Sequence, residues 1–204
     1  MPERGLGPGL SEAGRKQAEE AGRFISELRS SLPAVGALYC SPLSRTRETA
    51  AILGKALDLT PLERHELVDC NAGDWAGASL RDLAKKPEWP TVMHYPSSFR
   101  FPGGESIREM QDRLVAAVRE LVSAHPGQTV VAVSHADPIK AVLADALGTH
   151  LDLFQRIVIS PASVSAISFG DLSPSVTLVN YTGPFNQLPK QAAPGGATTT
   201  EDRR

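Results

Sequence analysis

The segment from Val130 to Pro138 constrains the fold of this chain more than any other. An apolar run, Val130-Val131-Ala132-Val133, ends abruptly in Ser134-His135, and Asp137-Pro138 then opens a stretch with helical character. A continuous apolar run is typical of a strand that is buried on both faces of a parallel sheet. Open α/β proteins bind ligands at the carboxyl ends of such strands, so His135 is predicted to lie at a ligand-binding edge.

Helical and strand patterns alternate along the rest of the chain. Ser11 is a suitable N-cap for a helix whose apolar residues recur at spacings of three and four, and Ser41 is the expected N-cap of the next helix, with Pro42 at its first position. Further helices are predicted from Ser41-Pro42 to about residue 57, over 79–86, from Ser106 to His125 and over 137–147. Strands are predicted over 37–40, near Leu67, up to Ser134, over 163–169 and over 176–181. This alternation predicts an α/β fold of three layers, with helices on both faces of a mainly parallel sheet.

The 204 residues fit one domain with a substantial core. We expect this domain to span residues 1–182, and residues 87–104 within it to form a loop. Residues 183–204 are rich in Pro, Gly, Ala and Thr and end in a charged cluster, which predicts a disordered tail.

Charge and cysteine content argue against several classes of function. A net charge of −2 without a long basic run disfavours nucleic acid and membrane surfaces as partners. Cys40 and Cys70 stand alone and the histidines lack ligand spacing, so we expect no metal cofactor. The start of the chain has no apolar core of the signal-peptide kind, and the isolated cysteines suit a reduced, cytoplasmic setting.

Arg45 is predicted in the first turn of the helix that follows the strand over 37–40. Free N–H groups and the helix dipole attract anions there, and a guanidinium adds paired donors that suit a phosphate group. A solvated surface role is the commoner outcome for an arginine taken alone. Arg47 falls on another face of the same helix, and we expect it to be structural.

Three ordered motifs resemble those of the histidine phosphatase (phosphoglycerate mutase-like) superfamily. Residues 41–50, Ser-Pro-Leu-Ser-Arg-Thr-Arg-Glu-Thr-Ala, are similar to the family's Ser-x-Leu-x-Arg-(Ala/Thr)-x-x-Thr-Ala. Residues 67–77 are similar to its Leu-x-Glu-x-x-x-Gly-x-Trp-x-Gly, and His135 matches its second active-site histidine. The resemblance covers roughly residues 10–182 and implies a phosphoglycerate mutase-like fold and phosphoryl transfer to a histidine, without a metal, from a small phosphorylated substrate.

The resemblance also implies roles for individual residues. Arg45 matches the family's phosphate-binding arginine, and His135 matches the histidine that hydrogen-bonds the transferring phosphoryl group. Asp69 stands where the family has its general-acid glutamate, one methylene shorter. Ser134 and Asp137 are expected on the same rim, although Asp137 also suits an N-cap before Pro138.

Two further elements have both a functional and a structural interpretation. Arg100 and the aromatic residues between Trp89 and Phe101 either cover the pocket and bind substrate or form ordinary loop packing. Gly103-Gly104-Glu105-Ser106 looks like the family's Pro-Gly-Gly-Glu-Ser element, and a flexible turn followed by a helix cap is a sufficient explanation of it.

One family motif is missing from these residues. The family opens with a strand that ends in Arg-His-Gly, whose histidine is the nucleophile, and this sequence contains no Arg-His-Gly. We therefore expect a phosphomonoester hydrolase with impaired turnover and an unpaired edge in its sheet. A non-catalytic protein that binds phosphorylated ligands and a mutase-like isomerase are the alternatives. The sequence does not indicate the oligomeric state.

Overall fold

The computed structural model describes residues 7–170 and 173–183. Its central element is a parallel sheet in the order β2 (Leu62–Glu63), β1 (Val35–Cys40) and β3 (Thr129–Val133). Cys40 is in register with Val133, so the carboxyl ends of β1 and β3 lie side by side. The predicted parallel α/β architecture is confirmed.

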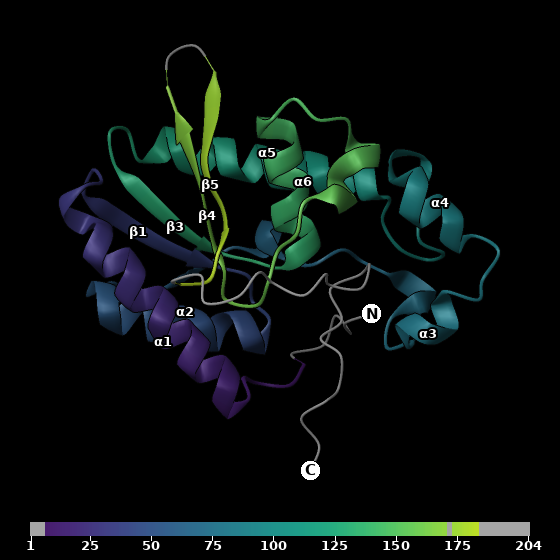
Figure 1. The fold of residues 1–204 in the computed structure, drawn as a ribbon, viewed down its shortest axis with the longest axis horizontal. Helices are drawn as coiled ribbons and strands as arrows, with labels where there is room; N and C mark the ends of the chain where they lie inside the picture. Colours follow the sequence, from purple (N-terminus) through teal and green to yellow (C-terminus); the bar gives the residue numbers. More distant parts are fainter. Residues whose placement is uncertain (1–6, 171–172, 184–204) are drawn as a thin grey trace.

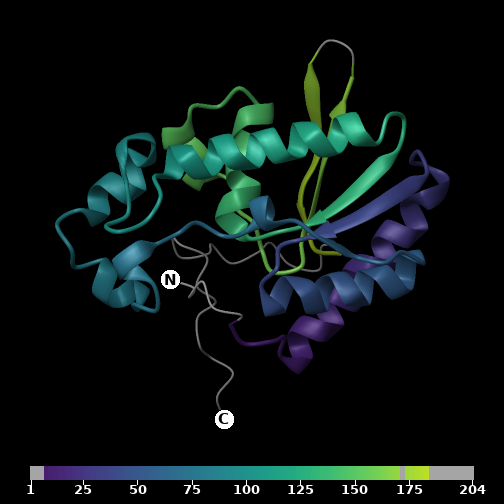
Figure 2. The same ribbon diagram turned by 180° about the vertical axis from the view of Figure 1, so that it is seen from behind.

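Helices cover both faces of this sheet (Figures 1 and 2). On one face lie α1 (Glu12–Glu27) and α2 (Ser44–Leu57), and on the other lie α5 (Ile107–Ala124) and α6 (Ala136–Ala146). The short helices α3 (Leu80–Leu83) and α4 (Trp89–His94) form a lobe at one side of the molecule. Short 3₁₀ turns occupy Leu28–Ser30, His65–Leu67, Gly73–Trp75, Pro96–Ser98 and Leu151–Arg156.

The apolar core has one part on each face of the sheet. Between α1, α2 and the sheet, the buried residues include Ala18, Leu38 and Leu57. On the other face, α5 and α6 pack against Trp75 and Phe101 among other buried residues. The helices on both faces explain the largely buried apolar run of β1. The strand β3 is less covered than its apolar run predicted, since Ala132 is exposed and its other residues are half-buried.

The remaining strands, β4 (Val164–Phe169) and β5 (Pro174–Tyr181), form a separate antiparallel hairpin. Figure 1 shows this hairpin rising beside β3, but the two are not joined by a ladder. Within the described residues, β3 therefore keeps one unpaired edge, as the sequence predicted. Thr129 N–H and Val133 C=O bond towards β1, so the backbone groups of Val130 and Ala132 point to the unpaired side.

Several sequence predictions of local structure were wrong. The strand near Leu67 is a 3₁₀ turn, and the strand lies five residues earlier at Leu62–Glu63. The region expected to be a loop over 87–104 contains α4, because Pro90 occupies a position in the first turn where its missing N–H costs nothing. The predicted tail falls mostly outside the described residues. Among the helices described, none is both long and apolar enough to span a membrane.

Candidate active site

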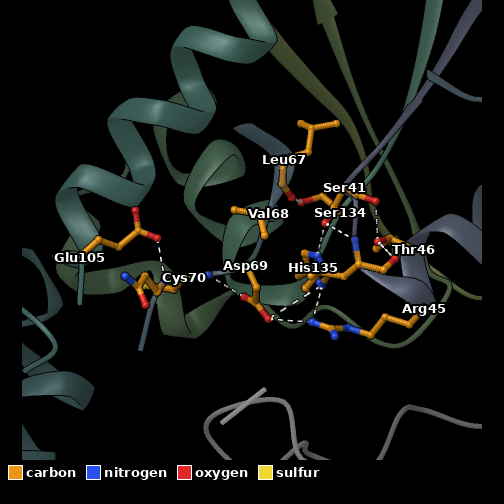
Figure 3. Close-up of polar contacts among 12 residues, drawn as sticks. Ser41, Arg45, Thr46, Leu67, Val68, Asp69, Cys70, Glu105, Ser134 and His135 are labelled. Atoms are coloured by element: carbon orange, nitrogen blue, oxygen red, sulfur yellow. Dashed lines mark hydrogen bonds and ion pairs between the residues drawn. The ribbon is translucent and has the colours of Figure 1, made fainter. Parts of the chain in front are cut away.

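Arg45 lies at the centre of a polar cluster at the carboxyl ends of β1 and β3 (Figure 3). It occupies the first turn of α2, as predicted. Its Nη2 atom is 3.3 Å from Asp69 Oδ2 and 3.0 Å from His135 Nδ1. One guanidinium therefore connects three segments that are far apart in the sequence.

His135 lies two residues after the end of β3 and is the N-cap residue of α6, where its side chain is 5% exposed. Its Nε2 atom lies 2.8 Å from Ser41 Oγ, and its Nδ1 atom faces Arg45 and lies 3.9 Å from Asp69 Oδ2. Burial and the positive charges of Arg45 and Arg113 lower the pKa of His135 to about 3. The imidazole is therefore neutral at physiological pH.

Asp69 lies beside Arg45 and His135 in this cluster. Burial and the neighbouring Asp137 carboxylate raise the pKa of Asp69 to about 6, against the lowering influence of the Cys70 N–H, Arg45 and Arg113. The Cys70 N–H donates to Asp69 Oδ1 at 3.0 Å. A carboxyl group with a pKa near neutrality is suited to general acid catalysis, since it still holds a proton in part of the population.

Residues outside the predicted site hold the loop that carries Asp69. Arg113 of α5 donates to the carbonyl oxygens of Glu66 and Val68, and its Nη2 lies 2.9 Å from Glu105 Oε1. Glu105 Oε1 also accepts the N–H of Asn71 at 2.7 Å. The loop is thus fixed on both sides of Asp69 by a half-buried ion pair.

Of Arg113 and Glu105, only Glu105 belongs to an element recognised in the sequence. Glu105 belongs to the Gly-Gly-Glu-Ser element, for which a flexible turn and a cap seemed sufficient, and the structure gives it a bracing role as well. Arg113 lies two turns into an amphipathic helix, and no local pattern distinguishes it from the other arginines there.

The structure assigns different local roles to several predicted residues. Ser41 is not the N-cap of α2, because Leu43 holds that position and the Ser41 hydroxyl faces His135. Asp137 is not an N-cap either, since its carboxylate pairs with Lys140 at 3.0 Å. Ser134 donates to the Leu67 carbonyl oxygen at 2.8 Å and so holds the loop that leads to Asp69.

A cavity of about 1320 Å³ opens from this cluster along the unpaired side of β3. Arg45, Asp69, Ser134 and His135 line it, and so do Trp89 and Phe101 from the region predicted to cover the pocket. Arg100 is not among the described residues of its wall; the Arg100 side chain is exposed and pairs with Glu109. The structure thus unites Arg45, Asp69 and His135 and leaves Arg100 outside the cluster.

Several relatives of the chain carry the name of a phosphatase. A phosphoserine phosphatase of Hydrogenobacter thermophilus is 31% identical over 179 residues, covering 87% of this chain and 82% of that protein. A bifunctional protein of Mycobacterium tuberculosis is 32% identical over 178 residues, which are 86% of this chain and 48% of the relative. The chain thus spans about half the length of that relative and of two similar mycobacterial proteins.

Solved structures share the fold. YhfR of Bacillus stearothermophilus superposes with a TM-score of 0.80 at 24% identity, covering 90% of this chain and 89% of that one. A mycobacterial glucosyl-3-phosphoglycerate phosphatase solved with inorganic phosphate gives a TM-score of 0.77 at 24% identity, with 89% and 91% covered. The sequence profile of the histidine phosphatase superfamily (branch 1) matches residues 3–182. The chain therefore belongs to the histidine phosphatase superfamily and has its phosphoglycerate mutase-like fold.

Proposed function

We propose that the Arg45–Asp69–His135 cluster binds the phosphoryl group of a small phosphomonoester, and that the protein is a phosphomonoester hydrolase that acts through a phosphohistidine. The observation that carries the proposal is the meeting of these three side chains at the strand ends, with Arg45 in the first turn of a helix. Arginine and the free N–H groups of the helix start both favour an oxyanion there.

Each residue has a distinct part in the proposed reaction. Arg45 neutralises the phosphoryl oxygens, and Asp69 gives its proton to the leaving alcohol oxygen when the ester P–O bond breaks. A histidine nitrogen forms a bond to phosphorus in that step, and water then breaks it to release phosphate. The sequence contains no Arg-His-Gly to provide this nucleophile, so we expect residues 1–204 alone to have little turnover.

Anion binding tests the proposal without requiring turnover. Calorimetry with phosphate or vanadate compares the wild type with Arg45→Ala and His135→Ala. Loss of a charged hydrogen bond is expected to weaken binding about ten- to a hundredfold. Arg47→Ala is the matched control, because Arg47 lies on the same helix and pairs with Glu63 at 3.0 Å. Equal affinity in all four proteins would contradict the proposed site.

The missing motif favours a second function, non-catalytic binding of a phosphorylated ligand. An aryl phosphate assay with acid quenching for phosphoenzyme distinguishes the two. We expect activity from a longer form in which an added strand ends in Arg-His-Gly, and little from residues 1–204. If neither form turns over while anion binding persists, the binding function is supported. Comparable turnover by residues 1–204 would require a substitute nucleophile.

We favour a phosphatase over a mutase-like isomerase. The segment between the Asp69 loop and α5 is short, whereas a mutase must retain a bisphosphate intermediate under a larger cover. The relatives whose names state a phosphatase activity also support this choice. A cytoplasmic setting, and partners that include neither nucleic acid nor membrane, stay predictions.

A further inference from the structure

Both ring nitrogens of His135 are engaged within the protein. Arginine has N–H donors and no acceptor, so the contact of Arg45 Nη2 with Nδ1 of His135, at 3.0 Å, requires Nδ1 to accept. A ring that accepts at Nδ1 is neutral and carries its one proton on Nε2, which donates to Ser41 Oγ at 2.8 Å. Neither ring nitrogen is left for a ligand while these two bonds exist.

The guanidinium of Arg45 is fixed through one of its three nitrogen atoms. Nη2 carries two N–H groups, and its contacts with His135 Nδ1 and with Asp69 Oδ2, at 3.0 Å and 3.3 Å, use both. Within the part of the chain that the structure describes, Nε and Nη1 form no hydrogen bond, so their N–H groups are open to an oxyanion. Because an arginine side chain otherwise has many rotamers, the contacts at Nη2 decide where these donors point.

Ser41 gives this series of hydrogen bonds a rigid origin. It is completely buried, its N–H donates to the Val133 carbonyl oxygen at 3.0 Å, and its own carbonyl oxygen accepts from Thr46 Oγ1 at 2.9 Å. The first of these bonds continues the pairing of β1 with β3 by one residue. Figure 3 shows the imidazole of His135 between Ser41 and the guanidinium of Arg45, so the ring connects the strand end to the site.

The two acceptors that hold Arg45 respond differently to pH. Burial and the Asp137 carboxylate raise the pKa of Asp69 to about 6, so Asp69 gains a proton as the pH falls below neutrality and then accepts more weakly. Burial and the two arginines near the ring lower the pKa of His135 to about 3, so the imidazole stays neutral in the same range. His135 is therefore the acceptor that holds Arg45 whether or not Asp69 carries its proton.

We propose that Ser41 and His135 are positioning residues for Arg45: Ser41 fixes the imidazole of His135, and the imidazole directs the Nε and Nη1 donors of Arg45 towards the phosphoryl oxygens. His135 thus acts through Arg45 and is not itself a ligand of the phosphoryl group. The inference rests on the proposed function, since it assumes that an oxyanion binds at Arg45.

Calorimetry with inorganic phosphate in a double-mutant cycle tests the inference. Ser41→Ala is expected to weaken binding about three- to tenfold, because Nε2 of His135 then has no acceptor and the ring is no longer held. In the His135→Ala background the same change is expected to alter the affinity by about twofold or less, since Ser41 then has no ring to act through. Equal losses in the two backgrounds would show that Ser41 acts by another route and would overturn the inference.

His135→Asn distinguishes an acceptor for Arg45 from a ring that touches the anion. The amide oxygen of asparagine can take the position of Nδ1 and accept from Arg45, whereas alanine offers no acceptor. We expect His135→Asn to bind phosphate within about threefold of the wild type, and His135→Ala to bind it about ten- to a hundredfold more weakly. Equal losses in the two variants would mean that the ring itself contacts the anion, and the inference would be wrong.

Two further measurements serve as controls. Ser44→Ala removes a hydroxyl from the first residue of α2 and is expected to leave the phosphate affinity unchanged. Urea unfolding verifies that each variant is folded under the conditions of the titration.

The protonation of the ring can be observed without a ligand. Long-range ¹⁵N–¹H spectra of the wild type report the proton on each nitrogen of His135, and we expect Nε2 protonated and Nδ1 bare. The opposite tautomer together with normal phosphate binding would overturn the inference alone. A wild type that does not bind phosphate would overturn the proposed function and the inference with it.

Discussion

The two edges of the five-residue strand β3 differ in their pairing, since one edge pairs with β1 and the other has no partner strand among the described residues. On the β1 side, the backbone groups are paired and the strand end leads directly to His135, Arg45 and Asp69. On the other side, the backbone of Val130 and Ala132 faces a cavity, and the β4–β5 hairpin forms its own sheet. The contacts that hold the candidate site among the described residues come from the β1–β3 pair and from the loop fixed by Arg113 and Glu105.

The largest difference between the two edges is expected in amide hydrogen exchange. The Val131 and Val133 N–H groups point towards β1, and those of Val130 and Ala132 point towards the cavity. The opening free energies of the two sets are expected to differ by about 5 kcal/mol, because only the first set requires global unfolding to exchange. Exchange measured by NMR in ²H₂O checks this, and equal protection along β3 would show that the outer edge is paired in solution.

The Arg113–Glu105 ion pair, which holds the Asp69 loop, predicts the next largest effect. Arg113→Ala removes the ion pair with Glu105 and two hydrogen bonds to loop carbonyl oxygens, so a loss of about 3 kcal/mol in the free energy of unfolding is expected. Arg119→Ala on the same helix is the control, because the exposed Arg119 is 3.8 Å from Asp145 and contributes about 0.5 kcal/mol or less. Urea unfolding gives both values, and similar losses would refute the brace.

Asp69 and His135 are expected to change the free energy of unfolding with pH in opposite directions. The pKa of Asp69 is raised to about 6, so its contribution to stability is greatest at low pH and is lost as the pH rises from about 4 to 6. The pKa of His135 is lowered from 6.5 to about 3, so its contribution to stability is present above pH 6.5 and is lost as the pH falls from there to about 3.

The wild type is therefore expected to have nearly constant stability between about pH 4 and pH 6, as far as these two groups determine it. Asp69→Asn removes the contribution of Asp69, so the free energy of unfolding of this variant is expected to increase by about 1.4 kcal/mol for each unit by which the pH rises. His135→Gln is expected to show the reverse slope. Unfolding curves across this range check the prediction, and identical profiles in the two variants would exclude it.

The smallest effect is expected where the hairpin meets α1. Phe24 and Tyr181 stack with ring centroids 4.1 Å apart and join the hairpin to the layer below. Tyr181→Ala is expected to cost about 1 kcal/mol, and Tyr181→Phe much less because the ring remains. Thermal unfolding compares the two variants. A loss in Tyr181→Ala as large as that in Arg113→Ala would mean that the hairpin, and not the braced loop, dominates stability.

The sequence predicted the strand ends and the two residues on them better than it predicted the supports of the site. Arg45 and His135 could be found because each follows an apolar strand within a few residues. Arg113 could not, since its contacts to Glu66 and Val68 join segments more than forty residues apart and leave no local pattern. Ser41 was misinterpreted because a serine before a helix suits both an N-cap and a buried hydroxyl partner.

The Gly-Gly-Glu-Ser element shows a similar limit. The predicted helix cap is present, since Ser106 is the N-cap of α5 and forms a capping box with Glu109. They do not reveal that Glu105 points to the Asp69 loop, because that contact depends on how the loop folds against α5. Local capping rules describe one helix at a time, whereas the contacts of Glu105 with Asn71 and Arg113 depend on how two segments pack together.

The free edge of β3 also affects how the protein behaves at high concentration. Thr-Val-Val-Ala-Val is rich in β-branched residues and uncharged, and unpaired backbone groups on such a segment are a template for strand pairing between molecules. A net charge of −2 provides little electrostatic repulsion between copies. We therefore expect the open edge of β3 to favour association between copies of residues 1–204 as their concentration rises.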